Sequence, residues 1–336
     1  FGAAVSDDAT VAESVGDGTT QIDGALRELA GSIRLAGALR DGGIAGKRSI
    51  AVGVYVTDPR ALATLLPVMR KTVPEEMFLS FLPSYGALGV ARAVERAKFT
   101  AADWRRTMMA SWMEFDGNIY LQQHNTAAIA RLMELARTEL GEEQIPGICF
   151  NHWRTAENRT TIRYAATAAI DGPTPADDFH RDYARRLDLG EGKEAYVEAM
   201  RRLDEVNGRV ERELSGIGFC FAGSWTKRPG MLWIRNWKPE NLVAIRDEFN
   251  AIAALLATVR GGAMEEGREY LDFLINRIGC SAIHLDAIGN LIALTPICDD
   301  AAPEKLGEEG RKEVIRRCDA ASQSVNEYLH LHAQMI

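Results

Sequence analysis

The sequence has 336 residues, of which 46% are hydrophobic and 26% charged, and its formal net charge is -8 at pH 7. This composition is ordinary for a folded globular protein and gives no indication of intrinsic disorder. Because the balance is acidic and no block of Lys and Arg stands out, we do not expect nucleic acid or an anionic membrane surface as the main partner. No apolar run approaches the roughly 20 residues that a membrane-spanning helix needs.

Five cysteines are scattered at long spacings without a Cys-x-x-Cys pair, which predicts buried free thiols that behave as small hydrophobes. They are Cys149, Cys220, Cys280, Cys298 and Cys318. The chain begins at Phe1 rather than Met and shows no signal peptide, so we interpret it as a fragment of a longer reading frame. The compartment therefore stays open. A reducing cytoplasm fits the thiols, and an upstream signal would direct the protein to the periplasm or out of the cell.

Residues 1–47 are predicted to form a polar loop and one helix, Gln21–Arg40, which ends at Gly42-Gly43. Residues 48–172 then alternate between strand and helix. Strands are predicted at Ser49–Val56, Met77–Leu82, Met108–Phe115 and Ile148–Asn151. Helices are predicted after them at residues 59–71, 88–97, 126–139 and 156–169.

Strands that alternate with helices indicate a parallel sheet. Four such units fit either a small open α/β sheet or the second half of an eight-unit β/α-barrel. Polar and aromatic side chains at the strand ends favour the barrel, because β/α-barrel enzymes place their site residues there. We therefore predict an α/β fold class with a partial TIM-type (β/α) barrel of about four units, whose first half lies upstream of Phe1.

The pattern changes at Pro173 and Pro175, after which the chain is almost entirely helical. Residues 173–336 are therefore predicted to form an all-α C-terminal domain. Its helices are expected at residues 175–187, 191–214, 240–260, 265–294 and 304–332. Residues 216–237 are expected to form a loop or short hairpin, which contains Trp225, Trp233 and Trp237.

The sequence Trp112-Met113-Glu114-Phe115-Asp116-Gly117 is the first candidate for chemistry. Residues two apart in a strand share a face, so Trp112, Glu114 and Asp116 are expected to point together, with Gln122 a little beyond. Carboxylates supply acid/base chemistry, and an indole offers an apolar face to a sugar ring. The structural alternative is a buried ion pair for Glu114 and a turn cap for Asp116.

The second candidate is the stretch Gly147–Asn158, where an apolar strand turns abruptly polar. His152 and Arg154 share a strand face and lie beside Trp153, which favours recognition of substrate hydroxyls or a carboxylate. Glu157 and Asn158 follow Arg154 at helical spacing. The structural alternative is an Arg154–Glu157 pair that holds the loop.

Two further aromatic residues are weaker candidates. Tyr85, in Pro83-Ser84-Tyr85-Gly86, is predicted either to line the same end of the barrel as these strand-end residues or to lie in a plain loop. Trp225 is predicted to supply a stacking wall or, alternatively, an apolar anchor between the domains. No short spacing resembles a metal site, and phosphate-binding, dinucleotide and serine-hydrolase motifs are missing, so neither a metal nor a cofactor is expected.

The WMEFDG stretch, the His152–Arg154 stretch with Glu157 and Asn158, and the helical C-terminal region are similar to glycoside hydrolases of the α-glucuronidase and β-hexosaminidase-like types. The similarity concerns the order of the structural elements and the polar residues at the strand ends, over roughly residues 45–300. It implies a (β/α)8 barrel with a helical C-terminal domain and hydrolysis of glycosidic bonds by a carboxylate pair. The sequence departs from this pattern because the first four barrel units are missing.

We therefore predict a glycoside hydrolase-like protein that acts on a carbohydrate. A glycan containing uronic acid or amino sugar is the candidate substrate, and a homo-oligomer is a candidate assembly. Glu114 and Asp116 are the predicted acid/base carboxylates, with Glu157 in reserve. The predicted substrate-binding residues are Tyr85, Trp112, Gln122, His152, Trp153, Arg154, Asn158 and Trp225. One alternative is a non-catalytic carbohydrate-binding or scaffold protein. Another is a polysaccharide lyase that uses His152, Arg154 and Tyr85.

Overall fold

A computed structural model describes most of the chain. The described residues are 18–42, 51–55, 61–75, 77–82, 87–112, 118, 120–141, 143, 147–151, 154–214, 237–294, 297 and 306–335. The chain divides into two compact units. The sheet unit comprises Phe1–Glu114, Asn125–Trp153 and Thr161–Pro173, and the helical unit comprises Phe115–His124, Arg154–Thr160 and Thr174–Ile336.

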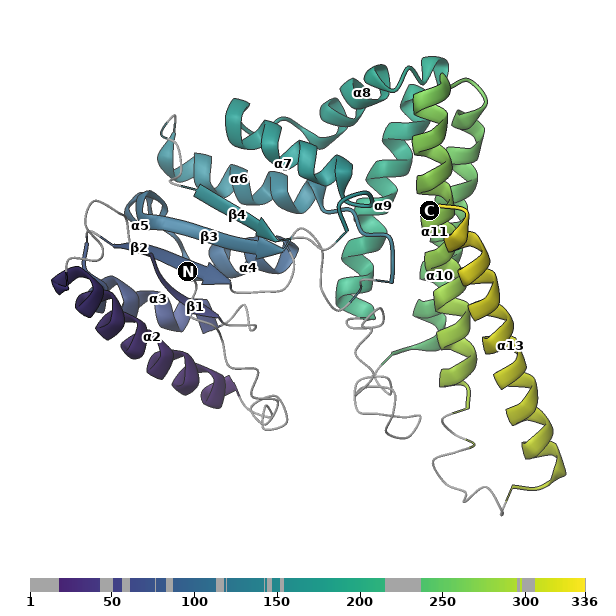
Figure 1. The fold of residues 1–336 in the computed structure, drawn as a ribbon, viewed down its shortest axis with the longest axis horizontal. Coiled ribbons are helices and arrows are strands. Elements are labelled where there is room, and N and C mark those ends of the chain that lie inside the picture. The colour runs from purple at the N-terminus through teal and green to yellow at the C-terminus, as the bar shows by residue number, and fades with distance from the viewer. Residues whose placement is uncertain are drawn as a thin grey trace. The chain divides into compact units, whose positions relative to one another are not determined.

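The sheet unit contains four parallel strands that neighbour one another in the order of the chain, β1-β2-β3-β4 (Figure 1). The strands are β1 (Ala51–Tyr55), β2 (Phe78–Leu82), β3 (Thr107–Trp112) and β4 (Gly147–Asn151). Their register places apolar residues in one row across the sheet, Val54, Phe81, Met109 and Ile148. Short apolar runs of this kind are typical of strands buried in a parallel sheet.

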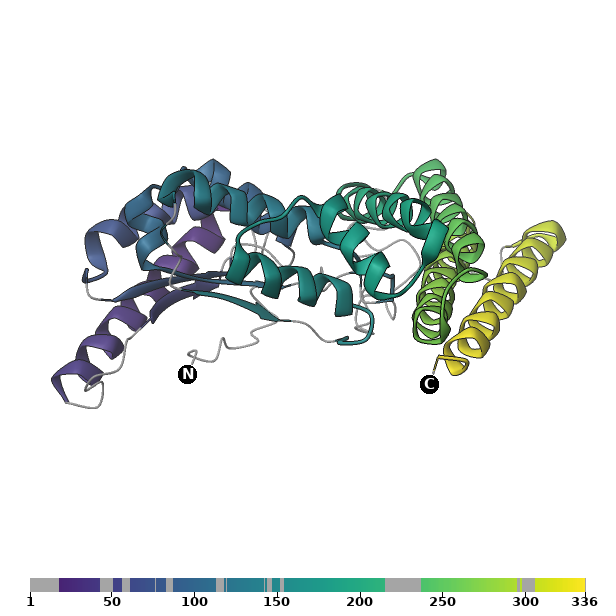
Figure 2. The same ribbon diagram turned by 90° about the horizontal axis from the view of Figure 1, so that it is seen from above.

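Helices accompany these strands in the sheet unit. They are α2 (Gly18–Asp41), α3 (Ala61–Thr72), α4 (Ala87–Ala97), α5 (Ala101–Arg106), α6 (Thr126–Leu140) and α7 (Arg159–Asp171), the last of which begins in the helical unit. In Figure 2 the sheet is seen nearly edge-on, with the blue helices gathered on one side of it. Their apolar faces form the core with β2, where the rings of Phe81, Phe99 and Trp104 make successive edge contacts.

The helical unit is built from α8 (Ala176–Arg186), the short 3-10 helix η2 (Gly190–Gly192), α9 (Lys193–Glu213), α10 (Pro239–Arg260), α11 (Glu265–Ile292) and α13 (Glu308–Ala333). In sequence order, α8 packs on α9, α9 on α10, α10 on α11, and α11 on α13. Buried residues recur every three or four positions, as in Ile245, Phe249, Ile252 and Leu256 of α10. This periodicity gives each helix one apolar stripe to bury against its neighbours.

The predicted partial barrel is wrong as a fold class. The described strands form an open sheet, in which β1 and β4 are edge strands with one neighbour each, and most of the described residues are helical. The alternation of strands and helices indicates parallel pairing, but closure also depends on strand tilt and register around a complete ring, which the pattern does not specify. The helical C-terminal region is confirmed. Among the described residues, no helix has the length and apolar character needed to cross a membrane.

Candidate metal site

Most of the residues predicted to carry the chemistry lie outside the described part of the chain. These are Tyr85, Glu114, Asp116, His152, Trp153 and Trp225. The structure describes only the backbone of Trp112, at the end of β3. The role predicted for each of these residues therefore remains a prediction.

The other four predicted residues, Gln122, Arg154, Glu157 and Asn158, come together in the helical unit through hydrogen bonds to backbone carbonyls. Gln122 Nε2 donates to the carbonyl of Glu157 at 3.2 Å. Arg154 Nη1 donates to the carbonyl of Leu121 at 3.1 Å, and Asn158 Nδ2 donates to the carbonyl of Arg154 at 3.0 Å. These contacts tie the segment around residue 121 to residues 154–158, so the side chains shape the local backbone.

The carboxylate of Glu157, the predicted reserve acid, lies beside a buried cation. Its Oε1 atom is 3.5 Å from Nε of Arg277, whose side chain is 3% exposed. Arg277 Nη1 also donates to the carbonyl of Tyr120 at 2.9 Å. An interior guanidinium needs a negative partner and accepting oxygens, and Glu157 and Tyr120 supply them.

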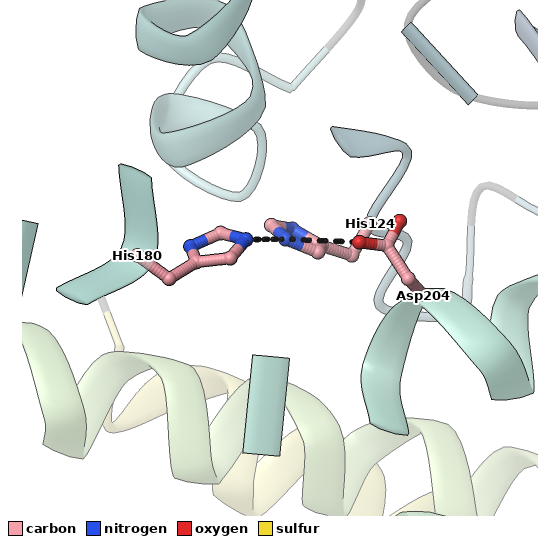
Figure 3. Close-up of side chains that lie close together, drawn as sticks. All are labelled: His124, His180 and Asp204. Atoms are coloured by element: carbon pink, nitrogen blue, oxygen red, sulfur yellow. Dashed lines mark hydrogen bonds and ion pairs between the residues drawn. The ribbon is translucent and has the colours of Figure 1, made fainter. Parts of the chain in front are cut away.

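In the part of the helical unit that the structure describes, three side chains of metal-binding types come together, His124, His180 and Asp204 (Figure 3). His124 lies in the irregular segment before α6, His180 on α8, and Asp204 on α9. The Nε2 atoms of the two imidazoles are 3.2 Å apart, and Asp204 Oδ2 is 3.8 Å from Nε2 of His124. In Figure 3 the His180 ring and the Asp204 carboxylate lie on either side of the His124 ring.

The fold buries this cluster because each helix turns its packed face toward it. His180 belongs to the buried stripe of α8 together with Phe179 and Tyr183. Asp204 follows Leu203, one of the fully buried residues of α9. His124 is 2% exposed, His180 is 0% exposed, and the side chain of Asp204 is 11% exposed. The polar atoms are therefore largely withdrawn from solvent.

Burial decides the charge of the two imidazoles. It lowers the pKa of His124 well below the usual range of histidine, and the neighbouring His180 acts in the same direction. Burial alone lowers the pKa of His180 from 6.5 to about 4. Both rings are therefore neutral at pH 7, and the contact between His124 and Asp204 is not a pair of opposite charges. A neutral imidazole is the form that binds metal ions.

The distances are compatible with a shared metal ion. The three ligand atoms lie within 4.8 Å of one another. A tetrahedral ion with bonds of 2.0–2.1 Å holds neighbouring nitrogen donors about 3.3 Å apart. The separation of 3.2 Å between His124 and His180 is close to this value, and the carboxylate of Asp204 has to move inward slightly. The alternative for the same distance is a direct N–H···N hydrogen bond between the two rings.

Buried tyrosines lie behind His180. The rings of His180 and Tyr196 meet edge to face at 6.3 Å between centroids. The hydroxyls of Tyr196 and Tyr270 are 3.4 Å apart, and the hydroxyl of Tyr270 is 2.7 Å from Oγ1 of Thr160. Burial raises the pKa of both tyrosines, so both hydroxyls keep their protons at neutral pH.

Comparisons with known protein families, with curated proteins and with solved structures found no match to this chain. Glycoside hydrolysis therefore remains a prediction of the sequence. The sequence prediction left out His124, His180 and Asp204, because they stand 56 and 24 residues apart and form no short motif. One signal was available: His180 lies between Phe179 and Tyr183 on the apolar side of a helix that is otherwise strongly charged.

Proposed function

We propose that the helical unit binds a divalent transition-metal ion through His124, His180 and Asp204. The observation that supports this proposal is the approach of two buried, neutral imidazoles, whose Nε2 atoms face each other at 3.2 Å, with a carboxylate beside them. Two nitrogen donors and one anionic oxygen donor are a common protein ligand set for such ions.

The ligand set favours Zn²⁺ as the first ion to test. Imidazole nitrogen suits Zn²⁺ and Fe²⁺ better than Mg²⁺ or Ca²⁺, which prefer oxygen ligands. Three protein ligands leave one tetrahedral position open for water, and a zinc-bound water loses its proton near neutral pH. The chemistry that such an ion would supply is the activation of water for hydration or hydrolysis of a small substrate.

Metal binding can be measured directly on the full chain. Protein stripped with a chelator is titrated with Zn²⁺ by calorimetry, and its metal content is measured after dialysis. Co²⁺ is added in a parallel experiment, because its visible absorption reports tetrahedral coordination. We expect one ion per chain and an intense Co²⁺ spectrum.

The variants His180→Ala and Asp204→Asn should each lose the tight site. The matched control is His332→Ala, which removes an exposed histidine near the end of α13. It should leave Zn²⁺ binding unchanged. If the wild type binds no more Zn²⁺ than His180→Ala, the close approach of the imidazoles is a hydrogen bond and the proposal is wrong.

A further inference from the structure

The segment that delivers His124 to the candidate site has unusual structural properties. We call residues 120–124 the anchor segment. It has no helix or strand, yet Leu121, Gln122, Gln123 and His124 are each no more than 2% exposed. Irregular polar backbone is costly to bury unless its groups find partners, and most connecting segments therefore run over the protein surface.

Side chains of the helical unit supply partners for successive backbone groups of the anchor segment. Arg277 donates to the carbonyl of Tyr120 at 2.9 Å, and Arg154 donates to the carbonyl of Leu121 at 3.1 Å. The amide of Gln122 donates to Oγ of Ser281 at 2.7 Å. Ser281 Oγ in turn donates to the carbonyl of Arg277 at 3.1 Å, so its donor and acceptor capacities are both used.

The anchor segment then reaches α8 and α9 through the imidazole of His124. This side chain brings its Nε2 atom to His180 of α8 and to Asp204 of α9. Nearby, Oε1 of Gln122 is buried and has no hydrogen-bond partner among the described residues. The segment is therefore held to α11 by hydrogen bonds from Arg277 and to Ser281, and it meets α8 and α9 at the His124 imidazole.

We propose that an ion bound by His124, His180 and Asp204 fastens the anchor segment into the helical unit, so that metal affinity and docking of the segment are linked. This inference rests on the proposed metal binding. An ion that binds only the docked arrangement stabilises that arrangement, and weaker docking lowers the observed affinity for the ion. Metal availability would then regulate whether the anchor segment stays docked.

Hydrogen exchange followed by mass spectrometry tests whether the bound ion stabilises the docked anchor segment. The full chain is compared after chelator treatment and with excess Zn²⁺. Peptides that cover residues 118–126 should exchange more slowly with Zn²⁺, by up to roughly 10³-fold at 1,000 times Kd. Peptides from the interior of α10 should exchange equally in both conditions. Equal exchange of residues 118–126 in protein that calorimetry shows to bind Zn²⁺ would overturn the inference and leave metal binding standing. Absence of Zn²⁺ binding would overturn both.

The variant Ser281→Ala tests whether weaker docking lowers the affinity for the ion. It removes the acceptor for the Gln122 amide and leaves all three proposed metal ligands in place. We expect its Zn²⁺ affinity to fall about tenfold, the effect of one lost hydrogen bond. The matched control is Ser324→Ala on α13, whose hydroxyl donates to the carbonyl of Ala320 in the preceding turn of the same helix at 3.2 Å. Wild-type affinity in a folded Ser281→Ala protein would show that docking and metal binding are independent. The exchange experiment on the wild type decides the question if this variant does not fold.

Discussion

The hydroxyl of Tyr270 on α11 lies 2.7 Å from Oγ1 of Thr160 at the start of α7, although 110 residues separate the two in sequence. Both residues are buried. The Tyr196 hydroxyl is 3.4 Å from the same Tyr270 oxygen, and the Tyr196 ring packs against His180. The contact between Tyr270 and Thr160 is thus linked, through the packed ring of Tyr196, to the candidate metal ligand His180.

Replacing Tyr270 with Phe should destabilise the protein by about 1–3 kcal/mol, because it removes the Tyr270 hydroxyl that contacts the buried hydroxyls of Thr160 and Tyr196. Urea unfolding followed by circular dichroism measures the change. Thr160→Val and the double variant complete a thermodynamic cycle. If the two single effects add within about 0.5 kcal/mol, the pair is not coupled and the 2.7 Å contact does not contribute as we expect.

Asp103 is a buried carboxylate of the sheet unit that accepts several hydrogen bonds. Its carboxylate accepts hydrogen bonds from Arg70 Nε at 2.8 Å and from the backbone amide of Thr100 at 2.7 Å. The Thr100 side chain accepts in return from the Asp103 amide, which completes a capping box at the start of α5. Asp103→Asn should therefore lower the free energy of unfolding by about 2 kcal/mol at pH 7.

The same carboxylate predicts a pH dependence. Burial raises the pKa of Asp103, but the hydrogen bonds from Arg70 and Thr100 outweigh burial and hold the pKa below its ordinary value of 3.8. The folded state thus binds a proton less readily than the unfolded state, and the stabilisation is present above pH 3.8 and disappears as pH falls through the lower folded value. The difference between wild type and Asp103→Asn should shrink below about pH 4.

Urea unfolding at pH 7 and at pH 3 checks both expectations for Asp103. The control is Glu143→Gln, because Glu143 pairs with Arg105 at 2.6 Å on the surface, where both side chains are about half exposed. An exposed pair contributes little, so this variant should behave like the wild type at both pH values. A constant difference between wild type and Asp103→Asn at the two pH values would contradict the assigned role.

Zinc should raise the thermal stability of the chain if the three ligands bind it in the folded state only. At 100 times Kd the expected gain is about 2.7 kcal/mol. Differential scanning fluorimetry with Zn²⁺, with a chelator, and with Mg²⁺ as the control ion measures the shift. His180→Ala should show no shift with Zn²⁺. An equal shift in wild type and His180→Ala would place the binding elsewhere on the chain.

The sequence predicted local structure better than it predicted closure of the sheet. Long apolar periodicities mark α10 and α11, because a helix buries one stripe wherever its neighbours lie. The short helix α5 was missed, although Thr100 and Asp103 stand at capping-box spacing in the sequence. Whether the sheet closes depends on contacts between its edges, and no pattern within one strand encodes those contacts.

The candidate site was harder to predict for a related reason. His124, His180 and Asp204 come from a loop and two helices, and they meet only because α8 packs on α9 and because the loop is drawn into the helical unit. Arg154, Glu157 and Gln122 were predicted to act together on a substrate. They do lie together: Gln122 and Arg154 donate to backbone carbonyls, and Glu157 faces the buried guanidinium of Arg277.

A close approach of two helices gives the sharpest prediction about packing. A Cβ added at Gly267, in the first turn of α11, would lie 2.2 Å from the backbone carbonyl oxygen of Leu187, just after α8. Backbone cannot yield as a flexible side chain can, so Gly267→Ala should cost about 1–3 kcal/mol or more. Gly31→Ala within α2 is the control, because a Cβ there meets nothing within 4 Å. It should stabilise the protein by up to about 1 kcal/mol, since Ala favours helix over Gly. Thermal unfolding of both variants should therefore shift in opposite directions, and a Gly267→Ala protein as stable as the wild type would rule out this approach of α11 to Leu187.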